Sequence, residues 1–213
     1  NRRGVAHINF PVDLQEHAVK DGERSKRNIA GHNVDVFAHA AGLPGEDDLR
    51  KAADVLNAGK KVTILAGRGA LGCAKELQEL AEKLGAPIVK ALLGKGAVPD
   101  LSPYTTGGIG LLGTAPSEDA MQDCDTLLVV GSSMPYIEFY PKPGSARGVQ
   151  FDMDPDRIGL RYPVEVGLVG DSRRTLQKLL PLLNRNEDRS FLETARKGMQ
   201  DWWKLIEERG TQM

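Results

Sequence analysis

The stretch Lys60–Gly72, KKVTILAGRGALG, constrains the fold of this chain more than any other. A basic start leads into the apolar run Val62–Ala66, and Gly67, Gly69 and Gly72 follow. A strand, a glycine-rich turn and a helix in this order open a nucleotide-binding βα unit. The glycines allow a tight turn close to a phosphate, and the first N–H groups of the helix can bind an anion. A tight turn that binds no ligand has the same pattern, so the rest of the chain must decide between the two.

Composition bounds the class of protein. A chain of 213 residues is long enough for one sizeable α/β core. Charged residues make up 27% and the formal net charge is −1, which gives no sign of a nucleic-acid or membrane-binding surface. No apolar run reaches the roughly 18–20 residues that span a bilayer, and there is no signal-peptide pattern. Cys73 and Cys124 have no metal-site spacing, so we expect two reduced core thiols and a cytoplasmic protein.

Helical and strand patterns alternate on both sides of the glycine turn. Acidic residues at 46–48 favour the first turn of a helix that Gly59 ends, and a second helix after the turn ends at Gly85. Short apolar runs predict strands over 62–66, 87–91, 126–130, 148–152 and 164–169. The alternation predicts an α/β fold with a parallel sheet and right-handed crossovers. Apolar residues mark one face of the two helices: Leu49, Ala52, Ala53 and Leu56, then Cys73, Leu77, Leu80, Ala81 and Leu84.

Small and acidic residues follow several of the predicted strands. The stretch 105–113 has four glycines in nine residues, so we expect a loop whose backbone can bind a ligand closely. The strand over 126–130 ends in small, turn-forming residues, at the edge where open α/β sheets bind ligands. Asp152 ends another strand and could accept a hydrogen bond from a ribose hydroxyl. Alternatively, Asp152 or Asp154 simply caps a short helix over 155–158, and Asp171 is well placed to cap the helix after the last strand.

The two ends of the chain have a different character. Residues 5–10 predict one short strand, which we expect to close a domain lying upstream, because a lone strand lacks ladder partners. Residues 14–45 are interpreted as a linker, and the spacing of His17, His32 and His39 fits no metal site. Residues 190–209 predict an amphipathic helix whose tryptophans pack against a surface.

Six motifs in the chain occur together in a known order. With them, this sequence resembles the thiamine-diphosphate (ThDP) enzymes of the pyruvate oxidase, quinone-dependent pyruvate dehydrogenase and acetolactate synthase group. The first stretch, VAHINFPVD at 5–13, is similar to the strand that closes the pyrimidine-binding domain of these enzymes. The six motifs are ILAGRGALG at 64–72, APIVKALLGKG at 86–96, GGIGLLG at 107–113, GSSMPYIEFYP at 131–141, QFDMDPDRIG at 150–159 and VGLVGD at 166–171.

The resemblance implies a domain organisation. Residues 1–13 would be the terminal strand of an upstream pyrimidine-binding domain, and 14–45 a linker. Residues 46–184 would form the central FAD- or nucleotide-binding domain, a three-layer Rossmann-like domain with a six-stranded parallel sheet in its own strand order. Residues 185–213 would be a linker helix toward an absent pyrophosphate-binding domain. The parent would be a homo-oligomer, a tetramer, with flanking ThDP-binding domains in the same chain and no nucleic-acid partner; whether it associates with a membrane stays open.

The resemblance also implies a cofactor site for FAD in an extended pose. Gly67, Arg68 and Gly69 would lie along the FAD, with Asp152 at a ribose or adenine and Asp171 near the adenine end. Ile137 departs from the pattern, because some quinone-dependent members have an arginine there. Backbone contacts would come from two further stretches: Ile109, Gly110, Leu111 and Leu112, and Ser132, Ser133, Met134, Pro135 and Tyr136.

Three functions follow as alternatives. The first is the FAD-binding central domain of a ThDP-dependent enzyme that decarboxylates a 2-oxo acid such as pyruvate and passes electrons to FAD. The second is a structural or ADP-binding central domain of a non-redox ThDP carboligase or decarboxylase. The third, an unrelated NAD enzyme, is the weakest, since no acid ends a strand about 20 residues beyond the glycine turn. The enzymes that this sequence resembles need a glutamate on the pyrimidine-binding domain and a Gly-Asp-Gly motif that anchors Mg²⁺ and ThDP. This sequence has only the last strand of that domain and no Gly-Asp-Gly motif. We therefore expect no catalysis and no metal binding from these residues alone.

Overall fold

The computed structural model describes residues 7–18 and 42–211, and the chain divides into two compact units, Asn1–Ala40 and Ala41–Met213. In the first unit a short helix, α1, spans Val12–Gln15. His7–Phe10 have no regular secondary structure, so the described part of the strand expected over 5–10 is not a strand. Within residues 7–18 there is no strand that could complete a ladder with this segment. His17 is exposed, and His32 and His39 lie outside the described residues.

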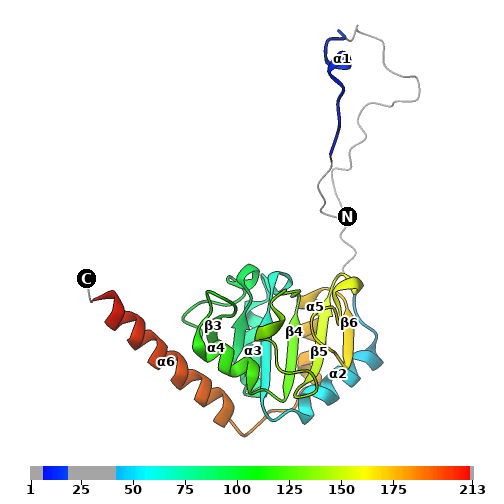
Figure 1. Ribbon diagram of the computed structural model, residues 1–213. Helices are drawn as coiled ribbons and strands as arrows, with labels where there is room; N and C mark the ends of the chain where they lie inside the picture. The colour runs from blue at the N-terminus through cyan, green and yellow to red at the C-terminus, as the bar shows by residue number, and fades with distance from the viewer. Residues whose placement is uncertain (1–6, 19–41, 212–213) are drawn as a thin grey trace. The chain divides into compact units, whose positions relative to one another are not determined.

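The second unit is built on a six-stranded parallel sheet in the order β3-β2-β1-β4-β5-β6 (Figure 1). This is the order typical of doubly wound dinucleotide-binding sheets. The prediction of a six-stranded parallel sheet is therefore confirmed. The prediction that its strand order differs from that of dinucleotide-binding sheets is wrong. The strands are β1 Val62–Ala66, β2 Ile88–Lys90, β3 Thr105–Gly108, β4 Thr126–Val130, β5 Arg147–Asp152 and β6 Val166–Val169.

Helices cover both faces of the sheet and bury two apolar clusters. On one face, α2 (Glu46–Ala58), α3 (Ala74–Leu84) and α5 (Ser172–Leu179) pack over side chains of β1, β4 and β5. On the other face, α4 (Ala115–Gln122) packs with the aromatic rings of Tyr140 and Tyr162. The predicted apolar faces of α2 and α3 are buried as expected. Removal of this apolar surface from water is the main stabilising contribution to such a core.

The glycine-rich stretch expected to be a loop contains an edge strand instead. β3 pairs with β2, and the register shifts between Ile88 and Val89. Gly107 has a φ of 96°, a backbone conformation that glycine adopts without steric cost. The glycines that lowered the expectation of regular structure thus permit the irregularity in this strand. The loop begins only after Gly108.

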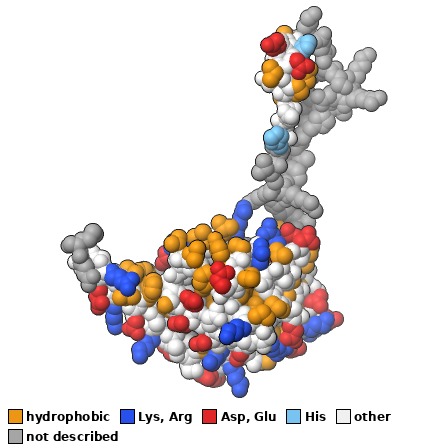
Figure 2. All heavy atoms as spheres, in the orientation of Figure 1, with side chains coloured by type: hydrophobic (Ala, Val, Ile, Leu, Met, Phe, Trp, Pro, Cys, Tyr) orange, Lys and Arg blue, Asp and Glu red, His pale blue; other side chains and the backbone are white. Residues whose placement is uncertain are grey.

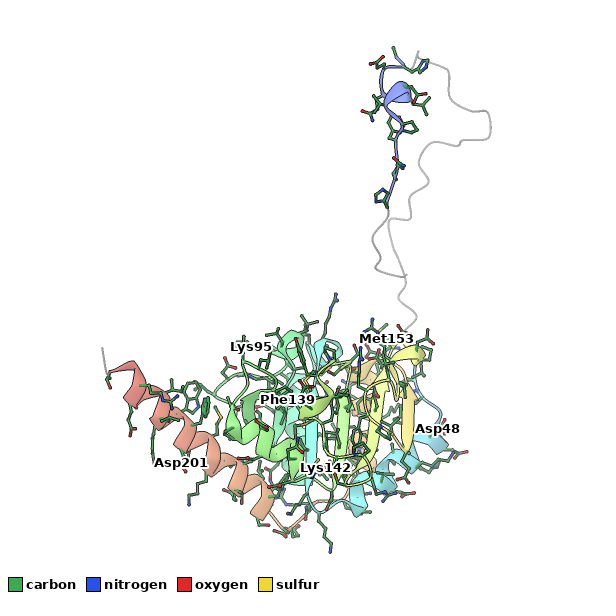
Figure 3. All side chains as sticks on the ribbon, in the orientation of Figure 1. Asp48, Lys95, Phe139, Lys142, Met153 and Asp201 are labelled. Atoms are coloured by element: carbon green, nitrogen blue, oxygen red, sulfur yellow. The ribbon has the colours of Figure 1, made fainter. Side chains whose placement is uncertain are left out.

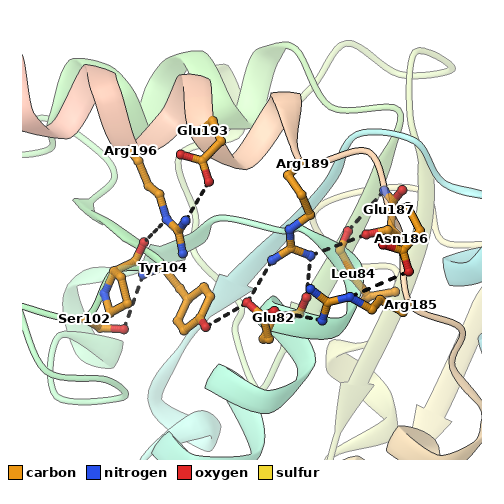
Figure 4. Close-up of polar contacts among 11 residues, drawn as sticks. Glu82, Leu84, Ser102, Tyr104, Arg185, Asn186, Glu187, Arg189, Glu193 and Arg196 are labelled. Atoms are coloured by element: carbon orange, nitrogen blue, oxygen red, sulfur yellow. Dashed lines mark hydrogen bonds and ion pairs between the residues drawn. The ribbon is translucent and has the colours of Figure 1, made fainter.

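The carboxylate of Glu82 on α3 binds the segment between α5 and the last helix (Figure 4). Glu82 accepts hydrogen bonds from Arg185 at 2.8 Å, from Arg189 at 2.8 Å and from the Tyr104 hydroxyl at 2.9 Å. The hydrogen bonds from Arg185 and Tyr104 lower the pKa of Glu82. The guanidinium of Arg196 lies 5.4 Å from the centre of the Tyr104 ring, a cation–π contact. These contacts fix where the last helix leaves the domain.

The last helix, α6, spans Ser190–Gly210, one residue longer than predicted, and leaves the sheet on the β3 side (Figure 1). Leu192 and Ala195 in its first turns are buried. Trp203 is 49% exposed and Ile206 is 42% exposed, so the expected packing of the tryptophan pair is incomplete in this chain. No helix in the described ranges has both the length and the apolar character needed to cross a membrane.

Candidate functional site

All the residues predicted for the cofactor lie at or beyond the carboxyl ends of the strands. Gly67–Gly69 follow β1, Ile109–Leu112 follow β3, and Ser132–Tyr136 follow β4; Asp152 ends β5 and Asp171 follows β6. Since the strands are parallel, these ends meet at one edge of the sheet. We call it the carboxyl edge. In Figure 3, Lys95, in the segment after β2, and Met153, directly after β5, both lie along it, and Lys142 lies lower, away from it.

The glycine turn is packed against two neighbouring loops. The Gly67 N–H donates to the Val130 carbonyl at 2.9 Å, and the Gly69 N–H donates to the Gly131 carbonyl at 2.9 Å. A Cβ added to Gly69 would lie 2.8 Å from the Gly131 Cα, and a Cβ added to Gly94 would overlap the Ala66 carbonyl oxygen. We call this contact of three loops the glycine junction. It lies at the ends of β1 and β4, which are neighbours in the sheet. From β1 the chain adds β2 and β3 on one side, and from β4 it adds β5 and β6 on the other side.

The glycine junction changes the interpretation of the opening motif. The N–H groups of Gly67 and Gly69 already have backbone acceptors, so they cannot be the phosphate donors that the sequence suggested. A 3₁₀ turn over Arg68–Ala70 follows, and α3 begins only at Ala74. The glycines are needed because backbone meets backbone here, with no room for a side chain. Arg68 itself is exposed and remains available to an anion.

The two cysteines are buried and free. Burial raises the pKa of the Cys73 thiol, with a further contribution from Glu76, and burial raises the pKa of Cys124 to about 12. A thiolate is the reactive form of cysteine. The two thiols are therefore core groups, as predicted, and not candidates for chemistry.

The loop after β4 is held in place by buried polar contacts. The Ser132 hydroxyl accepts the Met134 N–H at 3.3 Å, and the Tyr140 hydroxyl donates to the Met134 carbonyl at 3.2 Å. Burial raises the pKa of Tyr140 to about 12, so its hydroxyl stays a donor at physiological pH. The Arg157 guanidinium donates to the Ser133 hydroxyl at 2.8 Å and so connects this loop to the turn after β5. Tyr140 and Arg157 were not predicted as site residues, because only the fold brings them to this loop.

The acidic residues at the edge act first as caps. One oxygen of Asp152 accepts the Asp154 N–H at 3.0 Å, and Asp154 accepts the Asp156 N–H at 3.2 Å. Asp171 accepts the Arg174 N–H at 2.9 Å and caps α5. The capping roles expected for Asp154 and Asp171 are confirmed. Such contacts hold the carboxylates in fixed positions at the ends of β5 and β6.

Apolar side chains stand exposed along the carboxyl edge, where Figure 2 shows hydrophobic atoms gathered. Leu112 is 91% exposed and Leu111 is 80% exposed, whereas Ile109 is buried. An exposed apolar group of this kind usually marks a binding surface. The exposed side chains are Leu71, Leu92, Leu93, Leu111, Leu112, Tyr136, Ile137 and Met153.

Two hollows lie away from the carboxyl edge. One, of about 190 Å³, lies between α4 and the start of α6 and is lined in part by Asp119, Asp123 and Phe191. The other, of about 430 Å³, lies beside Lys83, Leu180 and other residues of α3 and the segment after α5. Neither is lined by a residue predicted for the cofactor. Among the described residues no group of three or more His, Cys, Asp or Glu could hold a metal ion.

Comparison with known proteins gives a consistent result. The family model described as "Thiamine pyrophosphate enzyme, central domain" matches residues 49–179. The "Putative thiamine pyrophosphate-containing protein YdaP" of Bacillus subtilis (strain 168) is 43% identical over 212 residues, which cover 100% of this chain and 35% of the relative. The "Probable acetolactate synthase large subunit" of Methanococcus aeolicus is 30% identical, over 86% of this chain and 31% of the relative.

A solved structure supports the same assignment. The "X-ray structure of a putative thiamin diphosphate-dependent enzyme isolated from Mycobacterium smegmatis" has a TM-score of 0.60 and 28% sequence identity to this chain. The match covers 75% of this chain and 32% of that one. This chain thus spans about a third of the length of these three proteins.

Proposed function

Since this chain belongs to the family of thiamine pyrophosphate enzyme central domains, we propose that its carboxyl edge binds FAD. The chain spans about a third of the length of the relatives described above, so the activity of a longer protein is part of the proposal. That protein is a ThDP-dependent enzyme that decarboxylates a 2-oxo acid of the pyruvate type. FAD, when bound, accepts electrons.

One observation carries the proposal: the predicted cofactor residues lie at or after the carboxyl ends of five of the six strands, on one edge of the sheet. The loops after β2, β1, β4 and β5 are joined to one another by the glycine junction and by the bond between Arg157 and Ser133. A surface joined in this way suits an extended ligand that crosses several loops. A ligand inserted deeply between β1 and β4 would have to separate the glycine junction.

The chemistry of the edge varies along its length. Leu111 and Leu112 follow β3 at one end of the sheet, and Tyr136 follows β4. Asp152 and Asp171 lie at the ends of β5 and β6. Apolar and aromatic side chains suit a flavin ring, and carboxylates suit ribose hydroxyls. The residues present thus fit the two ends of FAD.

Each group then has a defined role in holding the cofactor. The exposed guanidinium of Arg68 would offset the charge of the phosphates, in place of the glycine N–H groups that are already bonded. The carboxylate of Asp152 would accept a ribose hydroxyl. The backbone of Ser132–Tyr136 would bind the middle of the cofactor, held in shape by Tyr140.

A second candidate is favoured by the glycine junction itself. Direct packing of the loops after β1, β2 and β4 would also serve a domain that acts as a structural spacer, or that binds only ADP. This is the arrangement we would assign to a non-redox carboligase or decarboxylase. The acetolactate synthase among the relatives leaves this candidate open.

The domain organisation and cellular context are part of the proposal. We propose residues 1–13 as the end of an upstream domain, 14–45 as a linker, 46–184 as the central domain and 185–213 as a linker helix. Flanking domains of a longer chain would supply the ThDP and Mg²⁺ sites. The parent would be a cytoplasmic homo-oligomer, a tetramer.

Titration of this chain with FAD and with ADP, followed by calorimetry and by flavin fluorescence, tests the proposal. We expect both ligands to bind and to compete, because the adenosine end is common to both. Asp152→Asn should weaken the binding of both ligands. Asp119→Asn on α4 should not, because Asp119 lines the hollow between α4 and α6, away from the carboxyl edge. If FAD binds no more tightly than ADP, the result would favour the second candidate. Binding of neither ligand would overturn the FAD proposal.

A further inference from the structure

Gln150 is a buried polar side chain in the middle of a strand. It lies in β5 between Val149 and Phe151, which both belong to the apolar core, and it is only 4% exposed. Burial of a primary amide is costly unless its donors and acceptor find partners. A glutamine that occupies such a position therefore has a specific structural use.

The Gln150 amide bonds to two different segments at the carboxyl edge. Its Nε2 donates to the Ser132 carbonyl at 3.3 Å and to the Arg157 carbonyl at 2.9 Å. Its Oε1 accepts the Gly159 N–H at 2.9 Å. Both donors and one acceptor site are thus occupied. One side chain fixes the loop after β4 and the turn after β5 at the same time.

Each of these segments contains a glycine in a left-handed backbone conformation. Gly131 begins the loop after β4 with a φ of 56°, and Gly159 ends the turn after β5 with a φ of 73°. Ser132 is 5% exposed, so its carbonyl would have little access to water without the Gln150 donor. Removing one partner of a buried hydrogen bond costs more than the bond itself contributes, because the other partner stays desolvated.

We propose that Gln150 is a positioning residue of the nucleotide site. Its amide sets the distance between the Ser132–Tyr136 backbone and the Asp152 carboxylate, the two walls that would receive the adenosine half of the ligand. The part of this inference that concerns a ligand rests on the proposed function. The part that concerns the coupling of the two segments does not, because it stands on the three hydrogen bonds.

The test compares three variants. Gln150→Leu keeps the size of the side chain and removes all its hydrogen bonds. Gln150→Glu keeps an acceptor for Gly159, and only its protonated carboxyl can donate. Gln78→Leu is the control: Gln78 on α3 is partly buried, donates to Ala74 and accepts from Ser102, and it touches neither segment.

We expect Gln150→Leu to weaken ADP binding about tenfold, equivalent to about 1.4 kcal/mol, with wild-type affinity retained in Gln78→Leu. Burial raises the pKa of a carboxyl group, so Gln150→Glu should bind ADP most like the wild type at acid pH and lose affinity as the pH rises. A residue needed only for stability would lower the melting temperature without this pH dependence of affinity. Unchanged ADP affinity in Gln150→Leu would overturn the inference.

Amide hydrogen exchange tests the coupling of the two segments independently of the proposed function. If the wild type binds no adenine nucleotide, the proposed function fails, and exchange at the amides of Gly159 and Met134 then decides the coupling. Faster exchange at both sites in Gln150→Leu, but not in Gln78→Leu, would support the coupling. Exchange at wild-type rates would overturn it.

Discussion

The glycine junction predicts a sharp difference between two glycine-to-alanine changes. Gly131 and Gly144 both have positive φ angles, 56° and 87°. A Cβ on Gly131 would overlap the Gly69 Cα and lie 2.8 Å from the Gly69 carbonyl carbon, whereas nothing lies within 4 Å of a Cβ on Gly144. The two changes therefore share the backbone strain and differ in the steric overlap.

The expected magnitudes follow from these two contributions. Left-handed backbone costs a non-glycine residue about 1–2 kcal/mol, and overpacking adds about 1–3 kcal/mol. Gly131→Ala should therefore lower the free energy of unfolding by about 2–5 kcal/mol, and Gly144→Ala by about 1–2 kcal/mol. The gain from a less flexible unfolded chain is the same for both and cancels in the comparison.

Urea unfolding followed by circular dichroism measures both values. The slope of the unfolding free energy against urea concentration should be the same in the wild type and both variants, so that the midpoints report stability alone. Equal destabilisation by the two changes would refute the argument, because it would mean that the loops after β1 and β4 can separate at no cost. The same result would remove the reason given for the glycines of the opening motif.

Two further predictions concern contacts outside the junction. Asp171→Ala removes the cap of α5 and should cost about 1 kcal/mol in urea unfolding; no loss of stability would contradict the capping role. Glu82→Gln weakens the contacts with Arg185 and Arg189 and should lower stability by up to about 1 kcal/mol, since the carboxylate is partly exposed. Because the pKa of Glu82 is lowered in the folded state, its contribution is present above the unfolded pKa and is lost as the pH falls through the folded pKa. The stability difference between wild type and Glu82→Gln should therefore shrink in acid; a difference that is independent of pH would contradict this account.

Local sequence pattern predicted most of the elements of the second unit. The apolar runs at 62–66 and 126–130 became β1 and β4 with the expected bounds. The spacing of Leu77, Leu80 and Leu84 placed α3, and Gly85 ends it with a φ of 62°. These features depend on residues close together in the chain, so a single sequence is sufficient to find them.

Contacts between distant residues could not be predicted in this way. The glycine turn indicated a phosphate-binding backbone, but its N–H groups donate to Val130 and Gly131, more than sixty residues further along the chain. β3 was missed because an edge strand with an irregular register tolerates glycines that local propensity disfavours. Gln150 gave one usable signal, a polar residue inside an apolar strand.

A crystal structure of this chain grown with ADP tests the central claim most directly. We expect electron density for the nucleotide on the carboxyl edge, with the ribose at Asp152 and the phosphates facing Arg68. Density in the hollow between α4 and α6, or an edge without nucleotide at saturating ADP, would contradict it.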